Sequence, residues 1–324
     1  MKVFAARDDA VTMSQAYAEI QQQMLDAGKR NIVLTADFTH GMGLKEFAGA
    51  NPDRFLNMGI AEQNMASFAA GLAEEGFVPF IHCFGVFASR RMLDQLYISC
   101  AYARLNVKVV GADPGYTSGH NGGTHMAMED TAILRAIPQA LIVEPCDAAM
   151  LRAVVPMVAD YDGFAYMRLY RGRARTIYED GRRFTLGKAV CLREGSDMTL
   201  IACGQCVADA LSAADRLAAA GIQARVLDMF TIKPLDIAAV NAASSQTGLI
   251  VTVENASASG GLGGAVAEAL AGGDHAPVVR MGRGDVFGEV GTPGELKARY
   301  RLTAEDIYET ALTEYRRRKH AQSV

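Results

Sequence analysis

Short apolar runs alternate with longer alanine-rich segments along most of this chain. The runs are rich in Val, Ile, Leu and Phe, as at 31–35 and 249–254, whereas the segments between them carry apolar residues at helical spacing, as at 11–27. Buried parallel strands read as continuous apolar runs, and parallel strands are joined by crossover helices. The pattern therefore predicts an α/β protein with mainly parallel sheets flanked by helices.

This alternation occurs in two blocks, separated by a charged and weakly patterned stretch. We assign residues 1–175 to a first domain, 176–190 to a linker and 191–324 to a second domain. At 324 residues the chain is long enough for two hydrophobic cores. Each domain is expected to hold its own parallel sheet.

Within the first block, one long helix is expected over 86–104, followed by a strand at 106–110. A polar segment at 112–125 then interrupts the alternation. It holds a proline and several glycines, which exclude a helix there. In α/β folds, ligands bind at the carboxyl ends of strands, so this loop is a candidate for binding.

The composition excludes several classes of function. The chain is 50% hydrophobic and 21% charged with a net charge of −4, so nucleic acid and anionic membrane surfaces are not expected partners. No apolar run approaches the roughly 20 residues that cross a bilayer, and residues 1–9 contain no hydrophobic stretch of the length found in signal peptides. The six cysteines are scattered as in a reduced, cytoplasmic protein.

Two short motifs have a structural interpretation that we prefer to a chemical one. Cys203 and Cys206 form a lone C-x-x-C, which is more typical of a strand-to-helix turn than of a redox or metal site. The glycine-rich turn at 260–264 could cradle a phosphate, but it has neither a G-x-G-x-x-G fingerprint nor a Walker lysine. Tight backbone packing is the favoured explanation. The sequence leaves the roles of both motifs open.

A single carboxylate, Glu62, begins an apolar helix. A carboxylate in a first helical turn complements the helix dipole, so this position alone does not establish catalysis. Arg168 and Arg171 lie at the end of a strand, which separates them from the charged cluster that follows.

Taken in order, these motifs resemble the C-terminal half of transketolase, a pyrimidine-binding domain followed by a small C-terminal domain. The resemblance covers residues about 10–315. Its motifs are Thr35-Ala36-Asp37, Gly59-Ile60-Ala61-Glu62-Gln63, Cys83-Phe84-Gly85-Val86-Phe87, Gly122-Gly123-Thr124-His125, Glu129-Asp130, Met167-Arg168-Leu169-Tyr170-Arg171, Lys233-Pro234-Leu235-Asp236, and Val253-Glu254 with Gly260-Gly261-Leu262-Gly263.

The resemblance implies thiamine diphosphate as the cofactor. Glu62 would be the carboxylate that binds the pyrimidine N1′ and favours the imino tautomer that deprotonates the thiazolium. Phe87 would stack on the pyrimidine and Phe84 would line its pocket, while Arg90 and Asp37 would also contact the cofactor. Stacking of this kind contributes on the order of 1 kcal/mol.

The resemblance also implies a substrate site. His125 would contact the ketose oxygens as a hydrogen-bond donor or proton shuttle, which makes it the second catalytic residue beside Glu62. The implied substrate-binding set is Asp113, Asn121, His125, Arg168 and Arg171. Asn121 stands where the family has an aspartate that reads sugar stereochemistry, and Gly41 stands in place of a family serine. The substrate is therefore expected to be a non-standard ketose, such as apulose 4-phosphate or a sulfo-sugar.

The family's Gly-Asp-Gly motif and downstream Asn, which hold the diphosphate and its metal, are absent from the sequence. The chain itself is thus expected to ligate no metal. A second subunit would supply the Mg²⁺ (or Ca²⁺ or Mn²⁺) and diphosphate site, in a two-plus-two heterotetramer.

The implied activity is transfer of a two-carbon glycolaldehyde unit from a ketose to an aldose. Two other enzymes remain as alternatives: the beta subunit of a 2-oxoacid dehydrogenase, and an enzyme like deoxyxylulose-phosphate synthase. A regulatory subunit with a dead site is a non-enzymatic alternative, although Glu62 and His125 together argue against it. The sequence does not give the donor and acceptor sugars, nor whether the chain self-dimerises without its partner.

Overall fold

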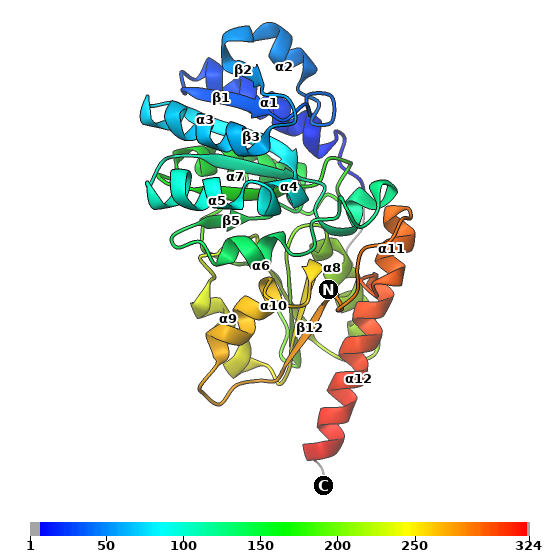
Figure 1. Cartoon of the computed structure of the whole chain (residues 1–324). Coiled ribbons are helices and arrows are strands. Elements are labelled where there is room, and N and C mark those ends of the chain that lie inside the picture. Colours follow the sequence, from blue (N-terminus) through cyan, green and yellow to red (C-terminus); the bar gives the residue numbers. More distant parts are fainter. Residues whose placement is uncertain (1–6, 323–324) are drawn as a thin grey trace.

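The computed structural model describes residues 7–322 and shows two α/β halves, one above the other in Figure 1. Each half is built on its own mainly parallel sheet flanked by helices, which confirms the predicted fold class. The predicted domain ends at 1–6 and 323–324 lie outside the described residues. Within the described part, no helix combines the length and apolar composition that crossing a membrane requires.

A seven-stranded sheet forms the upper half. Its strands are β1 (Asn31–Thr35), β2 (Phe55–Asn57), β3 (Val78–Phe84), β4 (Lys108–Ala112), β5 (Leu141–Val143), β6 (Ala165–Leu169) and β10 (Thr231–Lys233), in the order β10-β5-β6-β4-β3-β1-β2. All pairings are parallel except that of β10 with β5. Every residue of β1, β4, β5 and β6 is buried, including the polar residues Asn31, Lys108 and Arg168.

Helices cover both faces of this sheet. They are α1 (Met13–Asp26), α2 (Lys45–Ala50), α3 (Glu62–Glu74), α4 (Gly85–Arg90), α5 (Leu93–Gln95), α6 (Asp130–Arg135) and α7 (Ala148–Asp160), with the 3₁₀ segments η1 (Pro52–Arg54) and η3 (Gly115–Asn121) and the π-helix η2 (Leu96–Tyr102). Successive β1 residues face opposite sides: Val33 packs with Tyr17 of α1, and Leu34 packs with Met65 of α3. The sheet thus separates two hydrophobic cores.

The lower half holds a five-stranded sheet in the order β12-β11-β8-β9-β7. Its strands are β7 (Val190–Arg193), β8 (Met198–Ala202), β9 (Ala224–Asp228), β11 (Ile250–Ser257) and β12 (Val278–Arg283), and its helices are α8 (Cys206–Ala219), α9 (Ile237–Gln246), α10 (Leu262–Leu270), α11 (Pro293–Arg299) and α12 (Ala304–Gln322). Only β7 is antiparallel to its neighbour.

One strand crosses between the halves. β10 follows β9 of the lower sheet, yet it pairs with β5 at the edge of the upper sheet. Lys233 at its end donates hydrogen bonds to the carbonyls of Arg135 (2.7 Å) and Ile137 (2.5 Å) in the upper half. Sequence analysis did not predict this exchange, because the assigned boundary places residue 231 wholly in the second domain.

The predicted single helix over 86–104 is wrong. The chain forms α4, α5 and the π-helix η2 instead, and Met92 between the first two has the non-helical angles φ −109 and ψ 17. The polar segment at 112–125 also contains the 3₁₀ turn η3, although no α-helix, as predicted. The first difference arises from backbone geometry within a stretch whose apolar spacing looks continuous.

A buried histidine links α1 to the upper sheet. His82 of β3 is fully buried; its Nδ1 lies 3.1 Å from the carbonyl oxygen of Leu34 and its Nε2 lies 2.7 Å from the Tyr17 hydroxyl. The carbonyl can only accept, so Nδ1 carries the proton and Tyr17 donates to Nε2. Burial lowers the pKa of His82 to about 4, so the folded state favours the neutral ring.

The low pKa of His82 predicts sensitivity to acid. The stabilisation is complete above the ordinary pKa of about 6.5 and is lost as the pH falls toward 4, at a cost of roughly 2–3 kcal/mol. Urea unfolding from pH 8 to pH 4 measures this loss. His82→Gln, which can keep the Tyr17 contact but cannot become charged, should show a shallower decline over that range. An identical decline in the variant would contradict the assignment to His82.

Candidate functional site

The site residues gather where parallel strands of the upper sheet end. Asp37 follows β1, Phe84 ends β3, Asp113 follows β4, and Arg171 lies shortly after β6. Since β1, β3, β4 and β6 are neighbours running in one direction, their carboxyl ends meet at one edge. This is the edge at which α/β sheets bind ligands.

Glu62 is the first residue of α3, and only 3% of its side chain is exposed. The preceding chain turns at Gly59, whose φ of 69° favours glycine, and the N-cap Ala61 offers no capping side chain. One carboxylate oxygen, Oε1, binds Nη1 of Arg91 at 2.7 Å. The structure therefore holds a carboxylate at a helix N-terminus in a largely dry setting, with one partner described.

Three predicted rings form a cluster. The His125 ring lies 5.3 Å from the centroids of both Phe84 and Phe87, edge to face, and those two phenylalanines are 6.1 Å apart. Phe38 extends the cluster at 4.5 Å from Phe84. The guanidinium of Arg91 covers Phe87 at 4.0 Å from the ring centroid. Glu62, Phe87 and His125 thus belong to one contiguous site.

The loop that carries His125 is clamped from two sides. On one side, Arg90 of α4 binds Glu129 at 3.3 Å and approaches the carbonyl of Thr124 at 3.4 Å. On the other side, the backbone of Gly123 lies so close to Gly288 that a side chain at either position would collide with the other. Thr124 Oγ1 lies 2.9 Å from His125 Nδ1 and so orients the ring.

Asp113 and Arg171 bind each other. Arg171 Nε donates to Asp113 Oδ2 at 2.9 Å, and its Nη2 binds the same oxygen, while Nη1 donates to the carbonyl of Gly41 at 2.8 Å. The guanidinium also lies over the rings of Phe38 and Phe84. Arg171 therefore stands at the site, and an anion binding there would share it with Asp113.

Arg168 does not belong to the open site, which corrects its assignment as a substrate-binding residue. Its side chain is fully buried; Nε binds Asp130 at 2.8 Å and Nη1 binds Glu144 at 2.7 Å. Its Nη2 donates to the carbonyls of Ala127 and Asn255, so every nitrogen has a protein partner. The guanidinium joins the two halves of the molecule instead of facing a ligand.

Three other predicted residues lie at the rim. Asp37 is exposed, has a positive φ of 53°, and accepts a hydrogen bond from Asn57 Nδ2 at 3.2 Å. Asn121, at the end of η3, is also exposed, as is Arg90. Asp37 lies near the ring cluster, because the next residue in the chain, Phe38, contacts Phe84.

Sequence reasoning missed three residues that shape the site. Arg91 binds both Glu62 and the Phe87 ring, and Phe38 extends the ring cluster. Asn255 of β11 fastens the polar segment at 112–125, which holds several predicted substrate residues and is called the substrate loop below. Its Oδ1 accepts from the Tyr116 amide and its Nδ2 donates to the carbonyl of Pro114. The one signal in the sequence for Asn255 was its position directly after the motif residue Glu254, toward the end of a buried strand.

The glycine-rich turn before α10 packs tightly, as predicted. Glu254 accepts hydrogen bonds from the backbone amides of Leu262 and Gly263 at 2.7 and 2.8 Å, and a side chain at Gly261 would collide with that carboxylate. Burial raises the pKa of Glu254 to about 7. The helix N-terminus that could have held a phosphate is thus filled by a residue of the chain itself.

The C-x-x-C pair lies in a buried strand-to-helix turn. Cys203 is buried after β8 and donates to Glu144 Oε2 at 3.3 Å, while Cys206 begins α8 and its amide donates to the Cys203 carbonyl. Both thiols are free, and burial raises the pKa of each. Raised pKa values disfavour the thiolate that redox chemistry and metal binding need.

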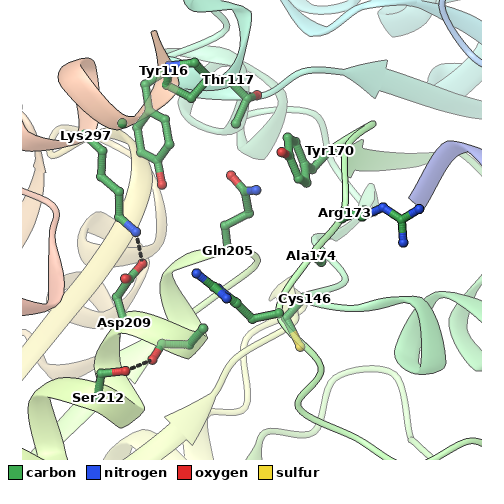
Figure 2. A pocket seen from close by; sticks show the side chains of 14 residues that line it. Tyr116, Thr117, Cys146, Tyr170, Arg173, Ala174, Gln205, Asp209, Ser212 and Lys297 are labelled. Atoms are coloured by element: carbon green, nitrogen blue, oxygen red, sulfur yellow. Dashed lines mark hydrogen bonds and ion pairs between the residues drawn. The ribbon is translucent and has the colours of Figure 1, made fainter. Parts of the chain in front are cut away.

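A separate cavity of about 430 Å³ lies between the halves, behind the substrate loop. Figure 2 shows Lys297 of α11 pointing at Asp209 of α8, with Gln205 between the rings of Tyr116 and Tyr170. Lys297 and Asp209 are 2.6 Å apart, and burial raises the pKa of Asp209 while Lys297 opposes that rise. None of the ring-cluster residues lines this cavity.

The site can be compared with known proteins at this point. Residues 9–176 match the family described as "Transketolase, pyrimidine binding domain", and residues 187–307 match "Transketolase, C-terminal domain". The chain belongs to the transketolase family. Membership of this family implies thiamine diphosphate as the cofactor.

Among curated transketolase relatives, the chain is 46% identical to a 6-deoxy-6-sulfo-D-fructose transketolase subunit of Clostridium sp. (strain MSTE9), covering 92% of the chain and 93% of that protein. It is 37% identical to an apulose-4-phosphate transketolase subunit of Phocaeicola vulgatus, covering 94% and 98%. A solved structure described as "Split gene transketolase, inactive beta4 tetramer" matches with a TM-score of 0.87 at 39% identity, over 94% of this chain and 98% of that one.

The residues present fit the pyrimidine half of the transketolase cofactor. Between Glu62 and Phe87 there is room for one flat group with N–H donors, because the Arg91 guanidinium already sits there, bound to the carboxylate and stacked on the ring. An aminopyrimidine ring is also flat, and it presents an N–H to a carboxylate when its N1′ carries a proton. Within residues 7–322 no group of three or more His, Cys, Asp or Glu side chains is placed to hold a metal ion.

Proposed function

We propose that this chain is the pyrimidine-binding subunit of a two-subunit, thiamine-diphosphate-dependent transketolase that acts on an anionic ketose. The observation that carries the proposal is the buried Glu62 carboxylate beside the Phe87 ring, with His125 in the same ring cluster. Transketolase chemistry needs these groups together: a carboxylate for the pyrimidine, a ring to stack on it, and a proton carrier for the sugar.

When bound, thiamine diphosphate supplies the nucleophilic carbon that adds to the carbonyl of the ketose. Glu62 would accept a hydrogen bond from the pyrimidine ring, and its burial makes that bond stronger than it would be in water. Phe87 would hold the ring flat, and Phe84 would close the apolar wall. The protein's part is to orient the cofactor and to keep water from it.

His125 is the residue we assign to proton movement at the sugar oxygens. Its Nδ1 is engaged by Thr124 Oγ1, so Nε2 is the ring nitrogen that we direct toward the substrate. The clamps on the loop at Arg90 and Gly123 keep the ring beside Phe84 and Phe87. A fixed imidazole can donate to a developing alkoxide without reorganising.

The anionic end of the ketose is assigned to Arg171. Two relatives act, by their names, on a sulfonated and on a phosphorylated sugar, and both substrates carry an anionic tail. Of the two arginines at the end of β6, Arg171 is part exposed, whereas Arg168 is buried. Asp113 holds Arg171 in place, and Asn121 at the rim would contact sugar hydroxyls.

The partner would supply the diphosphate and Mg²⁺ (or Ca²⁺ or Mn²⁺) site, because the sequence carries no Gly-Asp-Gly motif. The face of α3 and η2, next to Glu62, exposes several large apolar side chains, which is typical of a surface covered in an assembly. These are Ile60, Phe68, Tyr97, Ile98 and Tyr102. We assign this face to subunit contacts in a two-plus-two heterotetramer.

Co-expression with a diphosphate-binding partner tests the proposal. Two-carbon transfer from a panel of sulfonated and phosphorylated ketoses should require both subunits, thiamine diphosphate and Mg²⁺. Ile98→Asp should weaken assembly at least about tenfold, because a buried unpaired charge is costly. Ile237→Asp is the matched control: Ile98 and Ile237 are 53% and 56% exposed, but Ile237 lies on α9, in the other half. Full turnover by the chain alone would overturn the two-subunit proposal.

A further inference from the structure

Arg91 connects the two groups that the proposed function assigns to the cofactor. It directly follows α4, and its Nη1 binds Glu62 Oε1 at 2.7 Å while its guanidinium lies 4.0 Å from the centroid of Phe87. Its neighbour Arg90 turns the other way, to Glu129 and the loop that carries His125. The consecutive arginines therefore reach different parts of the site.

The guanidinium of Arg91 makes both contacts that a pyrimidine would need. It is flat, it stacks on the Phe87 ring, and its N–H edge faces the Glu62 carboxylate. No second flat group can bind Glu62 and cover the same face of Phe87 while Arg91 remains there. Arg91 therefore already makes the contacts with Glu62 and Phe87 that the cofactor ring would make.

We propose that Arg91 is a placeholder for the cofactor: it fills the pyrimidine position in the cofactor-free protein and leaves when thiamine diphosphate enters. This inference rests on the proposed function, since it takes Glu62 and Phe87 as the residues that contact the cofactor. It adds a step that the family assignment does not contain, namely the displacement of a protein side chain during cofactor binding.

Burial explains why such a placeholder is useful. The Glu62 side chain is 3% exposed, and a buried carboxylate without a partner is strongly destabilising. Arg91 satisfies it in the empty site. The Arg91 side chain is 43% exposed, so its guanidinium can return to water by rotating its own side chain. Glu62 exchanges one hydrogen-bond donor for another and is not left unpaired in either state.

Competition between Arg91 and the cofactor has a measurable consequence. Cofactor affinity is reduced by the fraction of sites that Arg91 fills, because only the open state can bind. Removing the arginine should speed binding and tighten it. A residue that stayed on Glu62 in the loaded enzyme and supported it there would give the opposite result.

The test measures binding of thiamine diphosphate with Mg²⁺ to the assembled two-subunit complex, by calorimetry and stopped-flow fluorescence. Arg91→Ala should bind at least about fivefold faster and more tightly than the wild type. The matched control is Arg30→Ala, which removes another arginine stacked on a phenylalanine: Arg30 lies 4.5 Å over Phe77, outside the site. The control should bind as the wild type does.

Thermal unfolding gives a second readout that does not depend on turnover. Without cofactor, Arg91→Ala should melt below the wild type, because Glu62 has lost its partner; with cofactor the two should coincide. Arg91→Gln, which keeps a hydrogen bond to Glu62, covers the case in which the alanine variant fails to fold, and it too should bind faster than the wild type.

The outcomes separate the two proposals. If the wild-type complex binds no thiamine diphosphate, the proposed function fails and the placeholder fails with it. If the wild type binds and both Arg91 variants bind no faster or bind more weakly, only the placeholder is overturned. A crystal structure of the loaded complex should show the guanidinium away from Glu62, and a retained Arg91–Glu62 pair would also overturn it.

Discussion

Replacing Glu62 by glutamine should lower the kcat of the reconstituted enzyme by about 10²- to 10³-fold, the usual effect of removing one preorganised electrostatic group. The amide keeps the size and one hydrogen bond of the carboxylate but loses its charge. Steady-state two-carbon transfer at saturating thiamine diphosphate measures the loss. The variant should still assemble, since Glu62 is buried and is not one of the exposed residues assigned to subunit contacts.

The control for this prediction lies on the same helix. Glu74 ends α3 and is exposed, so Glu74→Gln changes the same charge without touching the site and should leave kcat unchanged. Far-UV circular dichroism and sedimentation show whether each variant folds and assembles. Wild-type turnover by a correctly assembled Glu62→Gln enzyme would remove Glu62 from the mechanism.

Replacing Arg168 by methionine should destabilise the chain by about 3–5 kcal/mol, because it leaves buried carboxylates without their cation. The side chains of Asp130 and Glu144 are 0% and 3% exposed, and both bind Arg168. Urea unfolding of the isolated chain measures the change. Adding Asp130→Asn and Glu144→Gln to the same variant should recover part of the lost stability, since the unpaired charges are then gone.

An exposed ion pair provides the comparison for Arg168. The Arg299 side chain is 67% exposed and binds Glu289 at 3.2 Å, so Arg299→Met should cost less than about 1 kcal/mol. If Arg168→Met were equally mild, the buried network would not be what holds the halves together. If Arg168 instead bound substrate, its loss would raise KM with little effect on unfolding.

Arg168, within β6, and Arg171, shortly after it, show how much of the site could be predicted from the sequence. The pattern placed Arg168 and Arg171 correctly at the end of a buried strand, and the family resemblance implied substrate binding for both. Which of them is open depends on Asp130 and Glu144, which come from other elements and bury Arg168. Nothing in the spacing of two arginines reveals partners that far along the chain, so only Arg171 stays at the site.

The strands were the easier part of the fold to predict. β1 was predicted at its observed bounds, because an uninterrupted apolar run between a glycine and a polar turn leaves few alternatives. The helices within 86–104 were not predicted correctly, because the apolar spacing continues through Met92, where the backbone leaves helical geometry. The spacing of apolar residues indicates which side of a helix is buried. It does not indicate where one helix ends and another begins along a new axis.

Arg91 escaped prediction for a different reason. An arginine in a helical segment usually belongs to a solvated face, and Arg91 is indeed part exposed. Its role depends on the meeting of α4 with the start of α3, where Glu62 lies. Glu62, Phe87 and His125 were predicted because each lies in a motif that resembles the family. Arg91, which contacts both Glu62 and Phe87, lies in none of these motifs.

Strand β10 makes the upper half of the molecule depend on the lower half for its edge strand. Because β10 covers the edge of β5, a chain cut in the linker would leave that edge with unpaired amides and carbonyls, a surface prone to aggregation. A cut at 176–190 would therefore leave the first fragment without the edge strand of its sheet, and the second fragment with β10 unpaired. The two halves therefore depend on each other for a complete sheet edge, and we expect neither to fold well when it is expressed without the other.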